Sequence, residues 1–481
     1  MKRQILIACT VLLAAAQPGY SAPSERPNIV IILSDDQGYA DVGFNPHHGP
    51  GIITPNIDKI ARDGVIFEQG YITASMCLPS RAALLTGRYQ QRAGVHWAEV
   101  ASQPVRLLAD YLKEAGYVSG AFGKWHETGD IAGDLNPTAP PTRVVTSGDL
   151  AVDLNPTKRG FDEFYGFNHG GRDYYDLDNT ASDFAPLFRG TKCLKGTGEK
   201  GYLTHRLTDE AVDFIKRHRD QPFLVYLPYN AVHTPLQAQI EDVEVKHKYS
   251  TDPARKILLA MINYLDTGVG RILDTLKEEG LYENTLIFFL TDNGGSVLAT
   301  HADNTPLRGE KLQNYEGGIR VPFVLSWPAA VKGGRTFAAP VSSLDIVPTC
   351  LAAAGIPQPA SPRLDGINLL PLIDDKAAVA PPERDLFWWW KSGVGRPGGT
   401  PPPLGGGWAM RSGNWKLLQD SGDNPPPVQL FDLAADPKET TDLAKARPDL
   451  VADLKKRFDA WAVEVEADAS RARAPKDSAK P

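Results

Sequence analysis

A continuous apolar run near the N-terminus constrains the fold of this chain more than any other feature. Residues 28–33 read NIVIIL, and their apolar side chains are mostly β-branched and uninterrupted by polar ones. A strand of this kind is typical of a parallel sheet that is covered on both faces. Polar residues, Ser34, Asp35 and Asp36, follow it directly. The run therefore predicts a buried strand with carboxylates at its carboxyl end.

Further strands and helices alternate along the chain. Similar apolar runs predict strands at 118–122, 223–227, 286–290 and 321–326. Apolar residues at helical spacing predict helices at 56–63, 105–115, 203–217 and 257–279. This alternation indicates an α/β sheet with helices on both faces, and ligands in such sheets bind at the carboxyl ends of the strands.

The composition changes after about residue 380, where proline- and glycine-rich loops separate short strand-like pieces. An amphipathic helix is predicted at 448–466. We expect a large domain at 23–382, a small domain of antiparallel strands plus one helix at 383–467, and a flexible tail at 468–481.

The first 22 residues have the pattern of a secretory signal peptide. Lys2 and Arg3 precede a short apolar segment with small residues, and cleavage is expected after residue 16 or 22. No later stretch is long and apolar enough to span a bilayer. We therefore expect an exported protein, periplasmic or secreted, without membrane insertion.

Cysteine content and charge exclude several classes of protein. Of the four cysteines, Cys9 lies in the signal segment, which leaves Cys77, Cys193 and Cys350. So few cysteines exclude a disulfide-built scaffold; Cys193 and Cys350 form either one bridge or two separate thiols. The net charge of −7 is mild and spread along the chain, which argues against a nucleic-acid partner.

The segment from Cys77 to Arg81, read as CLPSR, carries the most specific motif. It is followed by an apolar run and by LTGR at 85–88. The pattern predicts a short helix that stops at Gly87. Cys77 then lies at a helix N-terminus, where backbone N–H groups and the helix dipole favour negative charge.

Two pairs of oxygen-bearing residues follow predicted strands. Asp35 and Asp36 end the first strand, and Asp292 and Asn293 end the strand at 286–290. Hard oxygen ligands without a His or Cys cluster suit calcium or magnesium rather than zinc. We expect the pairs to converge on one cation. In its absence the neighbouring carboxylates should repel one another and raise the pKa of at least one.

Four further polar residues are candidates for anion binding. Lys124 and His126 are two residues apart in GKWH, and on an extended segment they would point to the same side. His233 follows the strand at 223–227, and Lys311 lies in a polar loop.

The order of these segments and their amino-acid sequences resemble the motifs of the formylglycine-dependent (type I) sulfatase family of the alkaline-phosphatase-like superfamily. The resemblance covers residues 28–348 and continues at 430–433 and 436–439. It implies an α/β fold with a large mixed, mostly parallel sheet sandwiched by helices. A smaller C-terminal α+β domain would follow it.

The resemblance also implies residue roles. Cys77 would be oxidised by a maturase to formylglycine, whose hydrate attacks sulfur. Ca²⁺, or alternatively Mg²⁺, would be held by Asp35, Asp36, Asp292, Asn293 and the modified Cys77. Arg81 and Lys124 would steady the hydrate, and His126 would be the base that releases sulfate. His233 and Lys311 would bind the sulfate and assist the leaving oxygen.

The expected activity is hydrolysis of sulfate monoesters, and the expected substrates are O-sulfate groups on a carbohydrate or glycan. The alternatives are an arylsulfatase of small substrates, a phosphonate or phosphodiester hydrolase of the same superfamily, and a non-catalytic secreted glycan-binding protein. Substrate contacts are expected from loops 168–175 and 298–304, through His169, Arg172, Asp173, Tyr174 and His301. Tryptophans at 388–408 are more typical of a core.

Overall fold

The computed structural model describes residues 26–95, 105–126, 155–181, 185–374, 379–390, 407–420 and 426–473. The predicted signal segment with Cys9 lies outside them, as do residues 391–406 and 474–481. Among the helices described, none combines the length and the apolar character needed to cross a membrane.

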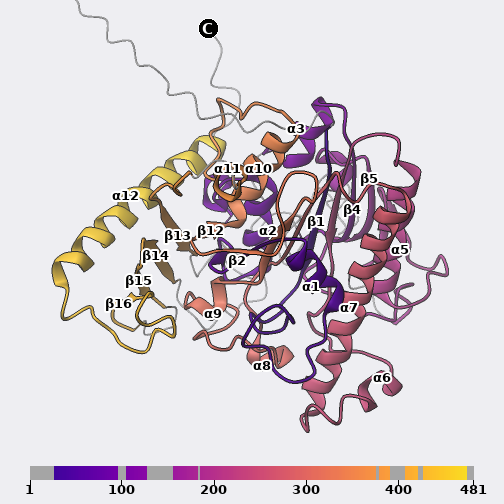
Figure 1. The fold of residues 1–481 in the computed structure, drawn as a ribbon, viewed down its shortest axis with the longest axis horizontal. Helices are drawn as coiled ribbons and strands as arrows, with labels where there is room; N and C mark the ends of the chain where they lie inside the picture. Colours follow the sequence, from indigo (N-terminus) through magenta and orange to yellow (C-terminus); the bar gives the residue numbers. More distant parts are fainter. Residues whose placement is uncertain are drawn as a thin grey trace, which may run out of the picture.

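A ten-stranded mixed sheet forms the centre of the molecule (Figure 1). Its five central strands run parallel, in the order β9 (Thr285–Thr291), β1 (Asn28–Ser34), β8 (Phe223–Pro228), β4 (Val118–Lys124) and β5 (Glu163–Phe167). One edge consists of β10 (Phe323–Ser326), β2 (Gly64–Phe67) and β11 (Arg335–Phe337), and the other of β6 (Phe188–Arg189) and β7 (Lys192–Cys193). Antiparallel pairing occurs toward both edges. The predicted mixed, mostly parallel sheet is confirmed.

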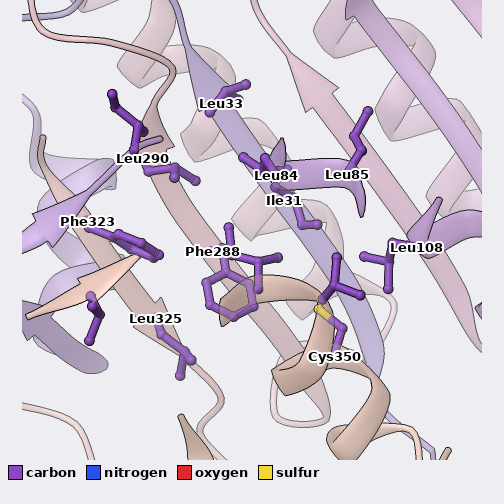
Figure 2. Packing of buried hydrophobic residues seen from close by; sticks show 14 of the residues in the cluster. Ile31, Leu33, Leu84, Leu85, Leu108, Phe288, Leu290, Phe323, Leu325 and Cys350 are labelled. Atoms are coloured by element: carbon purple, nitrogen blue, oxygen red, sulfur yellow. The ribbon is translucent and has the colours of Figure 1, made fainter. Parts of the chain in front are cut away.

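Helices cover both faces of this sheet, as the β1 sequence predicts. Ile29, Ile31 and Leu33 pack into one apolar core, and Val30 and Ile32 into the other. The first core is completed by α2 (Cys77–Thr86), α3 (Leu108–Glu114) and α10 (Ile346–Ala353), as Figure 2 shows for Leu84, Leu108 and Cys350. The second is completed by α1 (Pro55–Arg62), α5 (Leu203–Arg217) and α7 (Pro253–Glu278).

The cysteines outside α2 do not pair. Cys350 is buried in the first core, whereas Cys193 is exposed on β7, and both are free. A bridge between them, one of the two alternatives left open by the sequence, is therefore wrong.

A small antiparallel sheet follows, with strands β13 (Asp385–Trp389), β14 (Trp408–Ser412), β15 (Trp415–Gln419) and β16 (Gln429–Asp432). It lies between the large sheet and the long helix α12 (Pro448–Arg473) (Figure 1). Trp388 is buried, and its Nε1 donates to the Ile72 carbonyl at 2.6 Å. The expectation that the tryptophans here belong to a core is confirmed for Trp388, and the predicted end of the last helix at residue 466 is wrong. The remaining elements are short: β3 (Gly70–Tyr71), β12 (Val341–Ser342), α6 (Ile240–Glu244), α8 (Val297–Thr300), α9 (Glu316–Ile319) and α11 (Leu370–Ile373).

A buried ion cluster joins the small sheet to the large domain. Lys416 Nζ on β15 lies 2.9 Å from Glu316 Oε1 of α9 and 2.8 Å from Glu439 Oε1. All three side chains are fully buried. Burial disfavours ionisation of Glu316, but Lys416, Arg320 and Arg411 together lower its pKa to about 2, whereas burial raises the pKa of Glu439 to about 7.

Replacing Lys416 with methionine is expected to lower the free energy of unfolding by about 3–5 kcal/mol. The change removes the one cation that contacts both buried carboxylates, and breaking a buried ion cluster costs far more than an exposed ion pair is worth. Lys455→Met is the matched control, because Lys455 pairs with Asp459 on the exposed surface of α12. Denaturant unfolding of both variants measures the difference, and equal stabilities would contradict the expectation.

Candidate active site

Strand register brings the two acidic pairs together. Ser34 of β1 is the partner of Thr291 on the parallel strand β9, so the residues that follow, Asp35 and Asp292, share one edge of the sheet. Asp36 N donates to Asp292 Oδ1 at 3.4 Å. The convergence that the sequence predicts is therefore present.

The oxygens of this cluster fit a hard cation. Ligand atoms of Asp35, Cys77 and Asp292 lie within 4.8 Å of one another. Asp35 Oδ1 and Asn293 Oδ1 are buried and have no hydrogen-bond partner among the described residues. Buried oxygens are rarely left without a partner, and carboxylate and amide oxygens are ligands of Ca²⁺ and Mg²⁺. The residues present thus fit the cation that the sequence predicts.

Cys77 is the first residue of α2, which begins and ends where the motif predicts. Every residue of the helix is buried, and Gly87 closes it with φ 65°, a left-handed conformation that glycine adopts at no steric cost. Burial raises the pKa of the Cys77 thiol, and Asp35 and Asp292 raise it further against the effect of the nearby lysines. Around neutral pH the group is a thiol and not an activated thiolate.

Three cationic side chains contact the carboxylates. Arg81 Nη2 lies 2.6 Å from Asp292 Oδ2, and Lys124 Nζ lies 2.5 Å from Asp35 Oδ2. Lys311 Nζ lies 2.7 Å from an oxygen of Asp36. Arg81 also donates to the Lys124 carbonyl at 3.0 Å. Arg81, Lys124 and Lys311 therefore each have a carboxylate partner.

The carboxylates carry opposite pKa shifts. Burial and the neighbouring Asp35 raise the pKa of Asp292 to about 6. Burial also disfavours ionisation of Asp36, but Lys311, His233 and Lys124 together hold its pKa well below its usual range. The expected rise in the pKa of at least one carboxylate is thus present.

His126 reaches the site in a different way from the one predicted. It lies after the end of β4 with φ 55°, so the alternation of an extended strand does not explain its side. Burial, followed by repulsion from Lys124 and Arg81, holds its pKa well below the usual range. His126 is therefore neutral and able to accept a proton.

His233 is held by the loop after β8. Its Nδ1 lies 2.7 Å from the Thr234 carbonyl, which fixes the ring, and its Nε2 lies 3.7 Å from Asp36 Oδ2. The ring is 19% exposed, so it faces both the carboxylate and solvent.

Two glycines that the sequence reasoning missed let loop 168–175 pass against both histidines. A side-chain carbon at Gly170 would lie 3.0 Å from the His126 ring, and one at Gly171 would lie 2.9 Å from His233 Nδ1. The adjacent glycines in HGGR were the available signal.

The expected substrate-binding residues divide into two groups. Arg172 is buried and donates to the carbonyls of Asp173, Asp176 and Ala185. Tyr174 is fully buried, and its hydroxyl donates to the carbonyls of Asn230 and His233 at 2.7 and 3.0 Å. Arg172 thus braces its own loop, and Tyr174 ties that loop to the His233 segment. The structure gives both side chains structural partners in place of the substrate contacts that the sequence predicts.

Of the other three residues in that prediction, His169 and Asp173 lie in the same loop, and His301 follows α8. The Asp173 carboxylate accepts from the backbone of Tyr175 and from Gln237, and so caps the loop. His301 ends α8, is 41% exposed and pairs with Asp252 at 2.5 Å. His169 precedes the two glycines and is half-buried. For His169, Asp173 and His301, substrate contact stays a prediction.

Comparison with known proteins identifies the family. Residues 27–356 match the sulfatase family model, and residues 310–464 match the model for the C-terminal part of N-sulphoglucosamine sulphohydrolase. The chain belongs to the sulfatase family. It is accordingly a sulfuric ester hydrolase.

Individual relatives agree with this assignment. The chain is 33% identical to the uncharacterized sulfatase YdeN of Escherichia coli K12, over 76% of this chain and 68% of that protein. It is 31% identical to human N-acetylgalactosamine-6-sulfatase, over 74% of this chain and 67% of the human protein. The crystal structure of Ps i-CgsB in complex with k-i-k-neocarrahexaose superposes with a TM-score of 0.76 at 34% identity, over 91% of this chain and 93% of that chain.

Proposed function

We propose that this sulfatase removes O-sulfate groups from a carbohydrate, using formylglycine made from Cys77 and a bound Ca²⁺. The observation that carries the mechanism is the convergence of Cys77 with Asp35 and Asp292, with their ligand atoms within 4.8 Å of one another. The carbohydrate assignment is supported by the relatives, one named for a sulfated amino sugar and one crystallised with a neocarrahexaose.

Formylglycine and the cation would each make a defined contribution to the reaction. The hydrated aldehyde of formylglycine supplies a hydroxyl nucleophile for sulfur, and the cation supplies positive charge beside the sulfate oxygens. The cation would be held by Asp35, Asp36, Asp292 and Asn293, with Mg²⁺ as the alternative to Ca²⁺.

The side chains of the site divide the remaining work. Lys124 and Lys311 place ammonium groups where the transferring sulfate is negative, a preorganised electrostatic stabilisation. His126, neutral and buried, is the base that accepts a proton when sulfate is released. His233 turns Nε2 toward the same anion site. Arg81 is fully buried. It forms ion pairs with Asp292 and Asp35 and donates to the Lys124 carbonyl, so it positions these groups.

Biogenesis forms part of the proposal. Cys77 is only 9% exposed at the start of a wholly buried helix, so a maturase cannot reach the thiol in the folded chain. We infer that oxidation precedes folding. Export, predicted from the N-terminal segment, places the mature enzyme in the periplasm or outside the cell.

A substrate panel tests the proposal. We expect release of inorganic sulfate from N-acetylgalactosamine 6-sulfate or from a neocarrahexaose, with kcat/KM well above that for a phenyl phosphonate. Activity on p-nitrophenyl sulfate alone would identify a small-substrate arylsulfatase. Faster phosphonate cleavage would favour the phosphonate hydrolase alternative, and glycan binding without sulfate release would indicate a non-catalytic protein.

A further inference from the structure

A cavity of about 520 Å³ is lined in part by Tyr175, at the end of loop 168–175, and by Gln239, in the segment after His233. Aromatic rings form its walls: Tyr175 packs edge-on against Tyr202 at 5.1 Å, and Tyr202 packs against Tyr264 at 4.9 Å. His205 contacts Tyr202 and Tyr264, at 5.3 and 5.4 Å. The size is in the range of small-molecule sites in proteins.

Both loops that line the active site continue into this cavity. A side-chain carbon at Gly171 would meet the His233 ring, and Tyr175 follows four residues later, within about 14 Å for a fully extended chain. The loop that carries His233 continues to Gln239, which also lines the cavity. The separation between the His233 site and the cavity along this loop is therefore on the scale of a few sugar units.

The polar groups of the cavity suit hydroxyls and not sulfate. Two carboxylates, Glu199 and Asp242, and one ammonium, Lys200, line the cavity, and Glu199 lies 3.6 Å from Arg206 Nη2. Burial lowers the pKa of His205, which leaves that ring neutral near pH 7. Asp242 accepts from the Tyr264 hydroxyl, and the Gln239 N–H donates to that hydroxyl at 3.2 Å. An anionic ester would meet no excess of positive charge here.

Tyr175 provides the accessible apolar face. Its side chain is 37% exposed, whereas Tyr202 is 6% exposed and forms the buried support behind it. The Tyr175 backbone is held separately, through its N–H to Asp173 Oδ1 at 2.7 Å. The side chain also has a hydrogen bond with the Gln239 side chain and packs on Tyr202, so the ring is held in place while part of its surface stays exposed to a ligand. Aromatic faces of this kind combine apolar contact with a polar hydroxyl.

We propose that this cavity, lined by Tyr175, Tyr202, His205, Gln239, Asp242 and Tyr264, is a subsite for an unsulfated sugar unit of an oligosaccharide substrate. The inference rests on the proposed carbohydrate sulfatase function and extends it. It assigns the substrate class: a glycan in which a neutral unit lies a few positions from the sulfate that is removed. Such a subsite adds binding energy far from the reacting sulfur, which positions the substrate.

The test compares Tyr175→Ala with Tyr175→Phe. With a sulfated neocarrahexaose, Tyr175→Ala should lower kcat/KM about three- to tenfold, mainly through KM, because one aromatic contact is lost. With p-nitrophenyl sulfate, which is too small to reach the cavity, kcat/KM should stay unchanged. Tyr175→Phe keeps the ring and should behave as wild type on both substrates. An equal loss on both substrates, or no loss on the hexasaccharide, would overturn the subsite.

A binding measurement separates this proposal from the proposed function. Saturation-transfer NMR of the intact enzyme with chemically desulfated neocarrahexaose and desulfated chondroitin hexasaccharide reports contact without turnover. Transfer to the sugar ring protons that disappears in Tyr175→Ala supports the subsite, even if no carbohydrate sulfate is hydrolysed and the proposed function fails. Absence of transfer from both sugars, or equal transfer in the variant, would reject it.

Discussion

Replacing Cys77 with alanine is expected to reduce turnover of every sulfate ester by a factor on the order of 10⁴ or more, because the nucleophile is lost. The fold should survive, since alanine suits a helix start and removes only one small side-chain atom. Cys77→Ser should be equally inactive when expressed aerobically, because a serine there would not be converted. Initial rates on p-nitrophenyl sulfate and on a sulfated sugar measure the effect, with thermal unfolding as the control for folding.

Mass spectrometry of the peptide that contains Cys77 checks the chemical basis of this expectation. Active enzyme should show the mass loss of thiol-to-aldehyde conversion in proportion to its activity. The raised pKa of the buried thiol agrees with a cysteine that serves as a precursor and not as a thiolate nucleophile. Full activity in a preparation that contains only unmodified thiol would disprove the assignment.

Loss of the cation is expected to have the second-largest effect. Asp36→Ala should abolish stoichiometric Ca²⁺ binding and lower kcat/KM by about 10²–10³-fold, the scale of a lost preorganised charge. Lys124 and Lys311 contact Asp35 and Asp36, at 2.5 and 2.7 Å, so a cation that draws on these carboxylates would leave the ammonium groups more available to sulfate. Chelation of the wild type should reproduce the loss, and added Ca²⁺ should restore activity.

Metal content and thermal stability provide readouts that do not depend on turnover. Ca²⁺ should raise the melting temperature of the wild type by mass action and leave that of Asp36→Ala unchanged. Asp252→Asn is the matched control, because this exposed rim carboxylate pairs with His301 outside the cluster. A variant that keeps its metal, or a wild type indifferent to chelation, would exclude this cation site.

The sequence by itself determined the layered core and the chemistry at its edge. The run at 28–33 predicted β1 because a strand buried on both faces needs apolar side chains at every position. Asp35 and Asp292 followed as neighbours, because parallel strands end at one edge. The helix from Cys77 to Gly87 was also predictable, since its start and stop signals are local. The choice of sulfatase chemistry came from the whole motif set and was confirmed by the family match.

Only the tertiary structure decided which polar groups find protein partners and which stay available to ligands. Arg and Tyr are residue types that often contact substrates. Here, however, Arg172 donates to backbone carbonyls such as that of Ala185, and the Tyr174 hydroxyl donates to the Asn230 carbonyl, close to His233. Lys416 has the sequence environment of an ordinary strand residue, but it pairs with two carboxylates from distant segments. The physical reason is that hydrophobic periodicity reports how deeply a residue is buried and on which face. Hydrogen-bond and ion-pair partners come from segments far away in sequence, and only the packed fold brings them together.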